Sequence, residues 1–405
     1  MSTTIKQTAH TIFKEFIQQR LPEYQALALE IHANPEVSNY EFYSSDLLIQ
    51  QLKKEGFSVE KDVAGHRTGF DARYKAEKEG ATLVFLAEYD ALEGIGHACG
   101  HNLFGTYSVL AASALKQVID EVGGEIRVYG TPGEEGGENG SAKGSFVREG
   151  YFEDVDAALC VHPNYRYTKT THTLANDPVD IKFHGISSHA ASAPEKAINA
   201  LEALIQVFNG INGLRLHLPS DVNIHGIITD GGRAANVVPD FASGRFFLRA
   251  KNRTTLNEVY KKVENVVHGA SLMTGASYEY GLFQNAVDDT ILVPKFDEVF
   301  FRHLEELAIP EEEIERLEPM SSIGSSDVGN VSQVIPTIQP TVSISDEYIV
   351  PHTEEFKAAA KSEKGLHSIA IAAELLARTA LELLENEETL NAIKEEHKIN
   401  VARGN

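Results

Sequence analysis

Two short stretches carry residues that could bind a metal ion and move protons. Cys99 and His101 are separated by one residue in AEYDALEGIGHACGHNLFG, and Glu134 and Glu135 are adjacent in GTPGEEGG. Thiolate, imidazole and carboxylate are donors that a borderline divalent ion such as zinc accepts. Adjacent carboxylates on an irregular backbone point in different directions, so one could hold a metal while the other takes a proton from water. Glycines would let the first stretch turn sharply enough for its pair to face one ion: Gly96, Gly100 and Gly105.

Each of these features also has an ordinary structural interpretation. A lone buried cysteine usually behaves as a small apolar residue, and adjacent glutamates most often lie on a solvated surface. Cys99 could also be a nucleophile paired with His97 or His101. Metal binding is favoured because two further histidines, His162 and His352, follow in the sequence, and a thiol hydrolase would not need them.

Length, charge and cysteine content limit the class of protein. A chain of 405 residues is long for one core, so two domains are expected. The net charge of −23 argues against a nucleic-acid partner, because phosphates require clustered Lys and Arg. No run of eighteen apolar residues predicts a membrane span, and the polar start MSTTIKQTAHTIFKEF does not read as a secretory signal. The two cysteines, Cys99 and Cys160, favour a reducing cytoplasm over a disulfide scaffold.

Three apolar segments that must position the candidate residues are predicted as buried strands. Residues 82–87 precede Asp90, residues 125–129 precede the paired glutamates, and residues 156–161 precede His162. Ligands of α/β sheets usually bind beyond the carboxyl ends of the strands. Three strands that end in candidate ligands therefore support one common site.

Helical periodicity predicts the elements around these strands. Helices are expected over residues 3–33, with a break at Pro22, then up to Gly56, over 106–117 and over 365–384. Residues 337–343 are expected to form one core strand, and the charged residues after Glu385 are expected to fray.

The pattern changes near residue 177. Residues 179–283 read as strand, helix, strand, strand, helix, strand, which is the order of a ferredoxin-like unit. We therefore predict an α/β fold with a catalytic domain of residues 1–177 and 288–405, built on a mixed, largely parallel sheet flanked by helices. Residues 178–287 are predicted to be an inserted ferredoxin-like α+β lid or dimerisation domain.

The ordered motifs resemble the metal-dependent aminoacylase and carboxypeptidase family. The likeness is greatest to its amidohydrolase branch of N-acyl amino acid hydrolases, aminobenzoyl-glutamate hydrolases and dipeptidases. It covers nearly the whole chain through HANPEVSNYE, AEYDAL, GHACGHN, GTPGEEGG, VHP, GISSHAASAP, GGRAANVVPD, IGSSDVGNVS and PHTEEF. The resemblance implies two divalent ions, zinc or manganese, in the first domain. It also implies that Cys99 bridges the ions and that four other residues complete their shells: His101, Glu135, His162 and His352.

The resemblance assigns further roles around the ions. Glu134 would be the general base, and His189 would reach across a dimer to help hold the oxyanion. Asn236 and Arg249 would contact the substrate, and Asp90 would orient a ligand. Three other residues fall near the site without an assigned role: Glu88, His97 and Asp327.

The chain departs from this branch at Asn102. Where the branch often has GHD after the bridging cysteine, this chain has GHN, so a carboxylate that would support a ligand is in question. The same variant occurs in dipeptidase-like members, which favours a dipeptide substrate.

These observations predict a cytoplasmic metallohydrolase that cleaves the amide bond of N-acyl amino acids or small dipeptides. A metal-activated water would attack, with Glu134 as base, in a homodimer or a dimer of dimers that binds neither nucleic acid nor membrane. The alternative is a non-catalytic metal-holding or partner-binding subunit that keeps the fold. The adjacent Glu134 and Glu135 argue against that alternative, because a binding module has no use for a base beside the metal.

Overall fold

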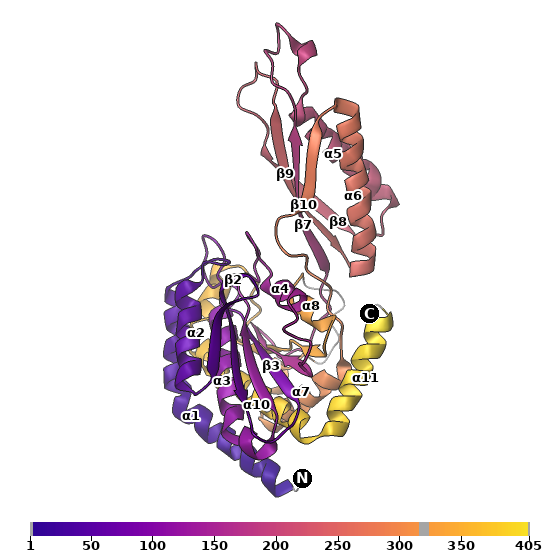
Figure 1. Ribbon diagram of the computed structural model, residues 1–405. Coiled ribbons are helices and arrows are strands. Elements are labelled where there is room, and N and C mark those ends of the chain that lie inside the picture. Colours follow the sequence, from indigo (N-terminus) through magenta and orange to yellow (C-terminus); the bar gives the residue numbers. More distant parts are fainter. Residues whose placement is uncertain (1–2, 316–323, 404–405) are drawn as a thin grey trace. The chain divides into compact units, whose positions relative to one another are not determined.

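The computed structural model describes residues 3–315 and 324–403, and the chain divides into two compact units. Unit 1 comprises Met1–His172 and Thr290–Asn405, and unit 2 comprises Thr173–Asp289. Among the described residues, unit 1 contains two clusters of buried apolar side chains and unit 2 contains one. Figure 1 shows the helices and strands of both units. Among the described residues, no helix combines the length and the apolar character needed to cross a membrane.

Unit 1 is built on a six-stranded sheet of order β1-β2-β4-β3-β5-β11. Its strands are β1 (Ser58–Val63), β2 (His66–Lys75), β3 (Thr82–Ala87), β4 (Glu125–Gly130), β5 (Ala157–Leu159) and β11 (Thr337–Ile338). β3 lies between β4 and β5 and runs parallel to both, while β2 is antiparallel to β1 and β4. The carboxyl ends of β3, β4 and β5 therefore meet at one edge of the sheet, as the sequence predicted.

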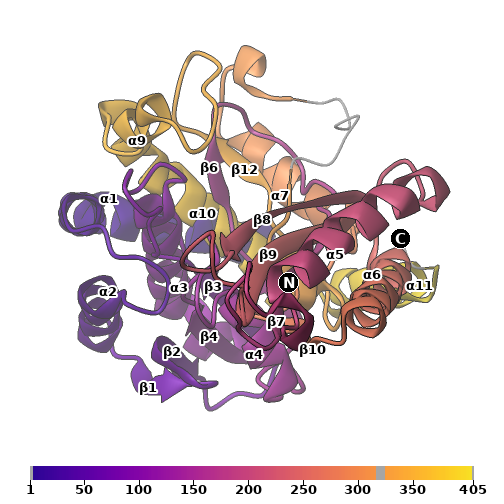
Figure 2. The ribbon, with the colours of Figure 1, turned by 90° about the horizontal axis from the view of Figure 1, so that it is seen from above.

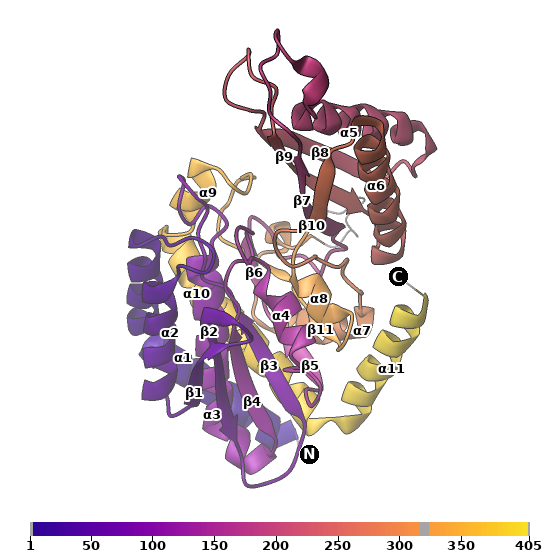
Figure 3. The same cartoon turned by 45° about the horizontal axis from the view of Figure 1, so that its top comes forward.

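Helices cover both faces of this sheet. Alternate side chains of β3, such as Phe85, share one core with helices on one face, and the others, such as Val84, share a second core on the other face. The first layer contains α1 (Thr3–Ala33), α3 (His101–Val122) and α10 (Glu363–Glu385), and the second contains α4 (Ala142–Arg148) and α8 (Val328–Ser332) (Figure 3). Burial on both faces explains why the strand TLVFLA is continuously apolar.

Unit 2 has the ferredoxin-like arrangement predicted from the sequence. Its four-stranded sheet has the order β10-β7-β9-β8, and every pair is antiparallel. The elements are β7 (Ala175–His184), α5 (Ala200–Leu214), β8 (Asn223–Asp230), β9 (Phe241–Ala250), α6 (Arg253–Thr274) and β10 (Ser277–Leu282). Both helices lie on one face of the sheet and fill its core (Figure 1). The mixed α/β class, with a sheet flanked by helices and an α+β insertion, is thus confirmed.

The remaining elements of unit 1 are short or peripheral. They are α2 (Phe42–Lys54), β6 (His162–Asn164), α7 (Pro294–Glu306), β12 (Thr341–Ser343), α9 (Glu354–Ala359) and α11 (Glu387–Arg403). β6 and β12 form a separate two-stranded parallel sheet and lie side by side in Figure 2.

Helix α1 continues through Pro22, so the predicted break was wrong. Pro22 is exposed, and so is Gln18, whose carbonyl loses its helical partner to the proline. Water can therefore take the lost hydrogen bond. Buried apolar residues before and after the proline, including Phe13 and Tyr24, hold both halves of the helix against the core.

Two predictions near the C-terminus were also wrong. The charged segment after Glu385 forms α11 rather than fraying, because Leu390 and Ile393 pack into the core. The single strand expected over 337–343 is divided at Pro340 into β11 and β12, which belong to different sheets. Proline has no N–H to continue a ladder, which accounts for this division.

Candidate metal centre

The start of α3 places Cys99 and His101. Gly100 precedes the helix with φ 77°, in the left-handed region. A Cβ at this position would lie 2.6 Å from Cγ of Pro163. Glycine is therefore required both for the backbone conformation and for the close approach, and the sharp turn predicted between the two candidate ligands is present.

Gly105 has a different role from the turn expected of it. It lies inside α3, where a Cβ would be 2.6 Å from the backbone carbonyl oxygen of Glu88. The missing side chain allows α3 to pack directly against the segment that leaves β3.

The five predicted ligands converge in unit 1. The ligand atoms of Cys99, His101 and His162 lie within 4.8 Å of one another, and so do those of Cys99, Glu135 and His352. Cys99 Sγ is 3.5 Å from His162 Nε2, and Glu135 Oε1 is 3.3 Å from His352 Nε2. Cys99 belongs to both groups, which is the arrangement that a ligand shared by two ions requires. We call these five residues the metal cluster.

Two buried atoms of the metal cluster indicate that its residues fit an ion. Among the residues that the structure describes, His101 Nε2 and Glu135 Oε1 have no hydrogen-bond partner. Buried polar atoms are almost always bonded, and an exception calls for an explanation such as a water molecule or an ion at that position. A mixed set of thiol, imidazole and carboxylate donors suits a borderline divalent ion, so the residues present fit the metal that the sequence implied.

Asp90 connects two of the cluster residues. Its Oδ1 accepts a hydrogen bond from His101 Nδ1 at 2.8 Å, and its Oδ2 accepts from the Glu135 backbone N–H at 2.9 Å. The first bond holds the His101 proton on Nδ1 and leaves Nε2 free to bind a metal. Asp90 follows β3 and Glu135 follows the adjacent strand β4, so the parallel pairing of these strands sets this contact.

The two remaining histidines come from β6 and from a loop before α9. His162 Nδ1 donates to the Pro163 carbonyl oxygen at 2.8 Å, which directs Nε2 toward Cys99. Burial lowers the pKa of His162, so its imidazole stays neutral, the form that binds metals. His352 has φ 66°, unusual for a non-glycine residue, and its N–H donates to the Ala98 carbonyl oxygen at 2.9 Å. Its backbone is therefore held next to the start of α3.

Glu134 faces the metal cluster from the loop after β4. Its Oε2 lies 4.0 Å from His101 Nε2. Burial, together with the carboxylates of Glu88 and Glu135, raises the pKa of Glu134 well above its usual value. A carboxylate with a raised pKa is a stronger proton acceptor, so this position can support a general base.

The surroundings of Cys99 argue against a thiol nucleophile. Desolvation raises the pKa of Cys99 well above its usual value, and Glu135 adds to this effect. Nucleophilic cysteines instead have lowered pKa values. A cation among the donor atoms would offset the charge of the thiolate, so the structure favours a ligand over a nucleophile paired with His97 or His101.

The three predicted substrate-side residues all lie in unit 2. The Ala190 N–H donates to the Asn236 carbonyl oxygen at 3.0 Å, so His189 and Asn236 lie on adjacent segments, and both are exposed. Asn236 lies shortly before Phe241, the first residue of β9, whereas Arg249 lies near the end of that strand. The eight residues from Phe241 to Arg249 span roughly 26 Å at about 3.3 Å per residue. Within unit 2, the structure thus brings His189 and Asn236 together and places Arg249 at the other end of β9.

Asn102 explains the departure from the GHD motif. Its Nδ2 donates to the carbonyl oxygens of Ala28 at 3.2 Å and Ala360 at 3.0 Å. It thereby ties α3 to α1 and to the segment before α10. An aspartate could not donate either bond, so the amide at this position serves packing, and Asp90 supplies the carboxylate that supports His101.

Sequence reasoning missed Lys143, which is completely buried. Its Nζ lies 2.8 Å from Glu88 Oε1 and 2.7 Å from Asp327 Oδ1. Glu88 occurs in the motif AEYDAL and Asp327 in the motif IGSSDVGNVS. By contrast, no feature of the segment SAKGSF distinguishes Lys143 from an ordinary surface lysine. A lysine shortly after a glycine-rich acidic loop is the one available hint.

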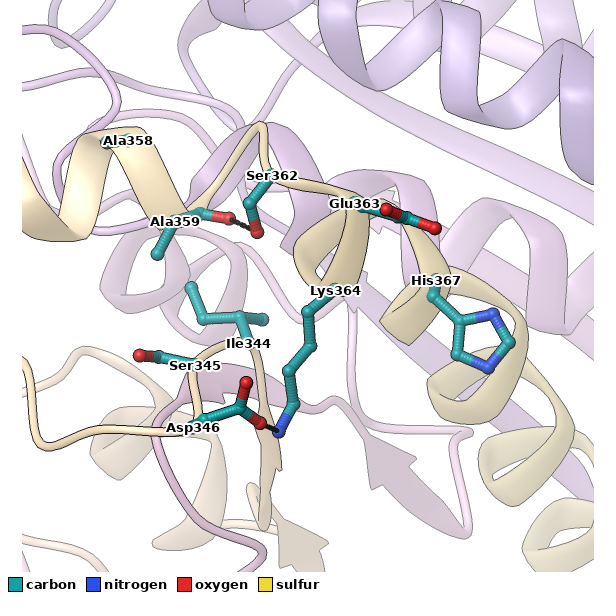
Figure 4. Close-up of a pocket in the computed structure, with 9 residues that line it drawn as sticks. All are labelled: Ile344, Ser345, Asp346, Ala358, Ala359, Ser362, Glu363, Lys364 and His367. Carbon is teal, nitrogen blue, oxygen red and sulfur yellow. Dashed lines mark hydrogen bonds and ion pairs between the residues drawn. The ribbon is translucent and has the colours of Figure 1, made fainter.

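A separate hollow of about 710 Å³ lies in unit 1 at the start of α10 (Figure 4). The Lys364 ammonium points across it and pairs with Asp346 at 2.6 Å and Glu313 at 3.0 Å. The residues that line this hollow include no member of the metal cluster. Its cation is already matched by carboxylates, so we assign it no ligand.

Comparison with known sequences identifies relatives of this chain. Residues 178–271 match the model of a peptidase dimerisation domain. The chain is 30% identical to human Xaa-Arg dipeptidase over 403 residues, which covers 95% of this chain and 91% of that protein. It is 35% identical to one of the subunits of p-aminobenzoyl-glutamate hydrolase from Escherichia coli strain K12 over 294 residues, 67% of this chain and 60% of the relative.

Solved structures share the fold. An aminobenzoyl-glutamate utilization protein from Klebsiella pneumoniae superposes with a TM-score of 0.71 at 20% identity, over 91% of this chain and 97% of that one. A Bacillus subtilis protein described as a dinuclear metal binding peptidase of the M20 family gives a TM-score of 0.61 at 18% identity, over 91% and 99% of the two chains.

The 30% identity to the human dipeptidase extends over nearly the full length of both chains, which is more sequence similarity than a shared fold alone explains. In addition, residues 178–271 of the inserted unit match the dimerisation domain of peptidases. With the convergence of thiol, imidazole and carboxylate donors in unit 1, these findings lead to one conclusion. The chain belongs to the M20 family of aminoacylases and dipeptidases, hydrolases that act on C–N bonds.

Proposed function

We propose that this protein hydrolyses the amide bond of N-acyl amino acids or small dipeptides with two divalent ions held by the metal cluster. The observation that carries the proposal is the convergence of Cys99, His101, Glu135, His162 and His352 in two groups that share Cys99. Relatives named p-aminobenzoyl-glutamate hydrolase and Xaa-Arg dipeptidase support the substrate class.

The proposed chemistry divides between the ions and the side chains. When bound, the ions supply Lewis acidity, which polarises a carbonyl group and lowers the pKa of water to about 7. Glu134 accepts the proton of the attacking water and later donates it to the leaving nitrogen, and its raised pKa helps it hold the proton between these steps. Asp90 keeps His101 and Glu135 in register through its two hydrogen bonds.

His189, which lies in unit 2, is proposed to complete the site from another copy of the chain. His189 would donate a hydrogen bond to the developing oxyanion, an effect of about 3–4 kcal/mol for one well-placed donor. Asn236 and Arg249 would bind the substrate. The exposure of His189 and Asn236 supports such a contact.

The proposal extends to the metal, the assembly and the compartment. A thiolate ligand favours zinc, while carboxylates also accept manganese, so either ion suits the cluster. The match of unit 2 to a peptidase dimerisation domain supports a homodimer or a dimer of dimers. Cys99 and Cys160 are both free thiols, which fits a reducing cytoplasm.

A substrate panel tests the proposed activity. The purified protein is expected to hydrolyse at least one member of a panel of N-acetyl amino acids, β-alanyl and Xaa-Arg dipeptides, and aminobenzoyl-glutamate when loaded with zinc or manganese. Chelation should reduce turnover to background, and re-addition of the metal should restore it, measured by chromatography of the released amino acid. Full metal occupancy without turnover on any substrate would instead support the non-catalytic subunit.

Substitution of Asp90 tests the support of the metal cluster. Asp90→Asn is expected to weaken metal affinity by roughly 10–100-fold, because the amide cannot accept the hydrogen bonds from both His101 and Glu135 equally well. Competition with a chromophoric chelator measures this affinity. The matched control is Glu93→Gln, at an exposed position in the same loop, which should bind metal like the unchanged protein. Equal affinities for the two variants would show that Asp90 does not support the ligands.

A further inference from the structure

A buried ionic network adjoins the metal cluster on the side of His101. Glu88 follows β3, Lys143 lies in α4, and Asp327 precedes α8. Lys143 Nζ lies 2.8 Å from Glu88 Oε1 and 2.7 Å from Asp327 Oδ1, and the Lys143 N–H also donates to Asp327 Oδ2 at 3.1 Å. All three side chains are fully buried. Burying one cation with two carboxylates leaves an excess negative charge that the protein must compensate.

The second oxygen of Glu88 faces the metal cluster. Glu88 Oε2 lies 3.2 Å from His101 Nε2, although neither atom has a hydrogen-bond partner among the described residues. Asp90 already occupies His101 Nδ1, so Nε2 is the nitrogen that can bind a metal. The ligand atoms of Glu88, His101 and Glu134 lie within 4.8 Å of one another. A carboxylate oxygen and a ring nitrogen that lie 3.2 Å apart, in a group whose ligand atoms all lie within 4.8 Å, are close enough to bind one ion together.

We propose that Glu88 is a sixth protein ligand, binding through Oε2 the divalent ion that His101 holds, with Lys143 as its positioning residue. This inference rests on the proposed function, because it requires a metal at His101. Lys143 occupies Oε1, so Glu88 binds through one oxygen. The ion in turn supplies the positive charge that the network of two carboxylates and one ammonium lacks.

The network provides its own matched control. Glu88 and Asp327 both pair with the Lys143 ammonium, at 2.8 and 2.7 Å, and both are completely buried. Glu88 alone of the two is grouped with His101 as a possible metal ligand. Glu88→Gln and Asp327→Asn therefore remove the same charge from Lys143 but differ in whether a metal ligand is lost.

Metal titration of these variants tests the proposal. The unchanged protein, titrated with zinc or manganese by calorimetry and checked for bound metal by elemental analysis, is expected to bind two equivalents. Glu88→Gln should bind one equivalent at least ten-fold more weakly and keep the other, while Asp327→Asn should keep both within about three-fold. Glu88→Asp, which retains the charge but shortens the reach, should also weaken one equivalent, and it replaces the glutamine variant if circular dichroism shows that variant unfolded.

The outcomes separate this proposal from the proposed function. If Glu88→Gln binds both equivalents as tightly as the unchanged protein, or if Asp327→Asn weakens them equally, Glu88 is not a ligand and the network is structural. If the unchanged protein itself binds no divalent ion, the proposed function fails first. Because the readout is binding, a loss of turnover alone decides neither question.

Discussion

Glu134→Gln is expected to lower kcat by roughly 10²–10⁴-fold while leaving metal content unchanged. This loss corresponds to about 3–5 kcal/mol of activation free energy. Glutamine keeps the size of Glu134 but cannot accept a proton from water. Burial and the carboxylates of Glu88 and Glu135 raise the pKa of Glu134, which favours acceptance of a proton at this position. Steady-state kinetics on the best substrate of the panel, with elemental analysis of the same samples, measures both quantities.

The control for this variant lies four residues further along the same loop. Glu138 is exposed, and Glu138→Gln should leave kcat within about two-fold of the unchanged enzyme. Turnover that survives in Glu134→Gln would remove the general-base role. Equal losses in the two variants would indicate a disturbed loop rather than a missing base.

Lys143→Met is expected to destabilise the protein by about 3–5 kcal/mol, because it leaves Glu88 and Asp327 buried without their cation. Methionine fills a similar volume, so the loss reports the charge rather than a cavity. Since the chain contains no Trp, urea unfolding is best followed by far-UV circular dichroism. The matched control is Lys364→Met in the hollow of Figure 4, whose ammonium pairs with Asp346 and Glu313 at a partly exposed position. Lys364→Met should destabilise the protein far less than Lys143→Met, because solvent screens the ion pairs of Lys364.

The destabilisation by Lys143→Met is expected to depend on pH. Burial raises the pKa of Asp327 even with Lys143 beside it, and removal of that cation raises it further. A carboxyl whose folded pKa exceeds its unfolded value of about 3.9 binds more protons when folded. The contribution of Asp327 to the free energy of unfolding therefore becomes less favourable as the pH rises above about 4. The loss of unfolding free energy in Lys143→Met should be larger at pH 8 than at pH 5. A loss that does not change with pH would contradict this account.

The elements that depend on local pattern were predictable from the sequence. The apolar run TLVFLA gave β3 with its correct bounds, and the order of strands and helices over residues 179–283 gave the ferredoxin-like unit. The failures have a tertiary cause. Pro22 does not break α1, because its lost hydrogen bond faces solvent and the apolar face stays buried. Similarly, α11 forms because Leu390 and Ile393 dock on the core, although most of its residues are charged.

The candidate site was predictable where residue type and chain order both carried information. Cys99, His101, Glu135, His162 and His352 form the groups that the resemblance implied, although their roles as ligands stay predictions. The surrounding charges were not predictable in the same way. Lys143 reads as a surface residue, and only the packing of α4 against α8 shows that it is buried between two carboxylates. From the sequence alone, Asn102 suggests that the GHD motif has lost a carboxylate. Its two hydrogen bonds to backbone carbonyl groups show instead that the amide connects helices.

The interruption of unit 1 by unit 2 affects the order in which the protein can assemble during translation. Four of the five residues of the metal cluster, and Glu88 as well, emerge from the ribosome before unit 2, and His352 emerges only after the chain has returned to unit 1 at Thr290. The core of unit 2 consists of one continuous segment, so it can condense while the larger unit still lacks α10. A nascent chain halted before residue 352 would therefore carry a finished insertion but an incomplete cation site.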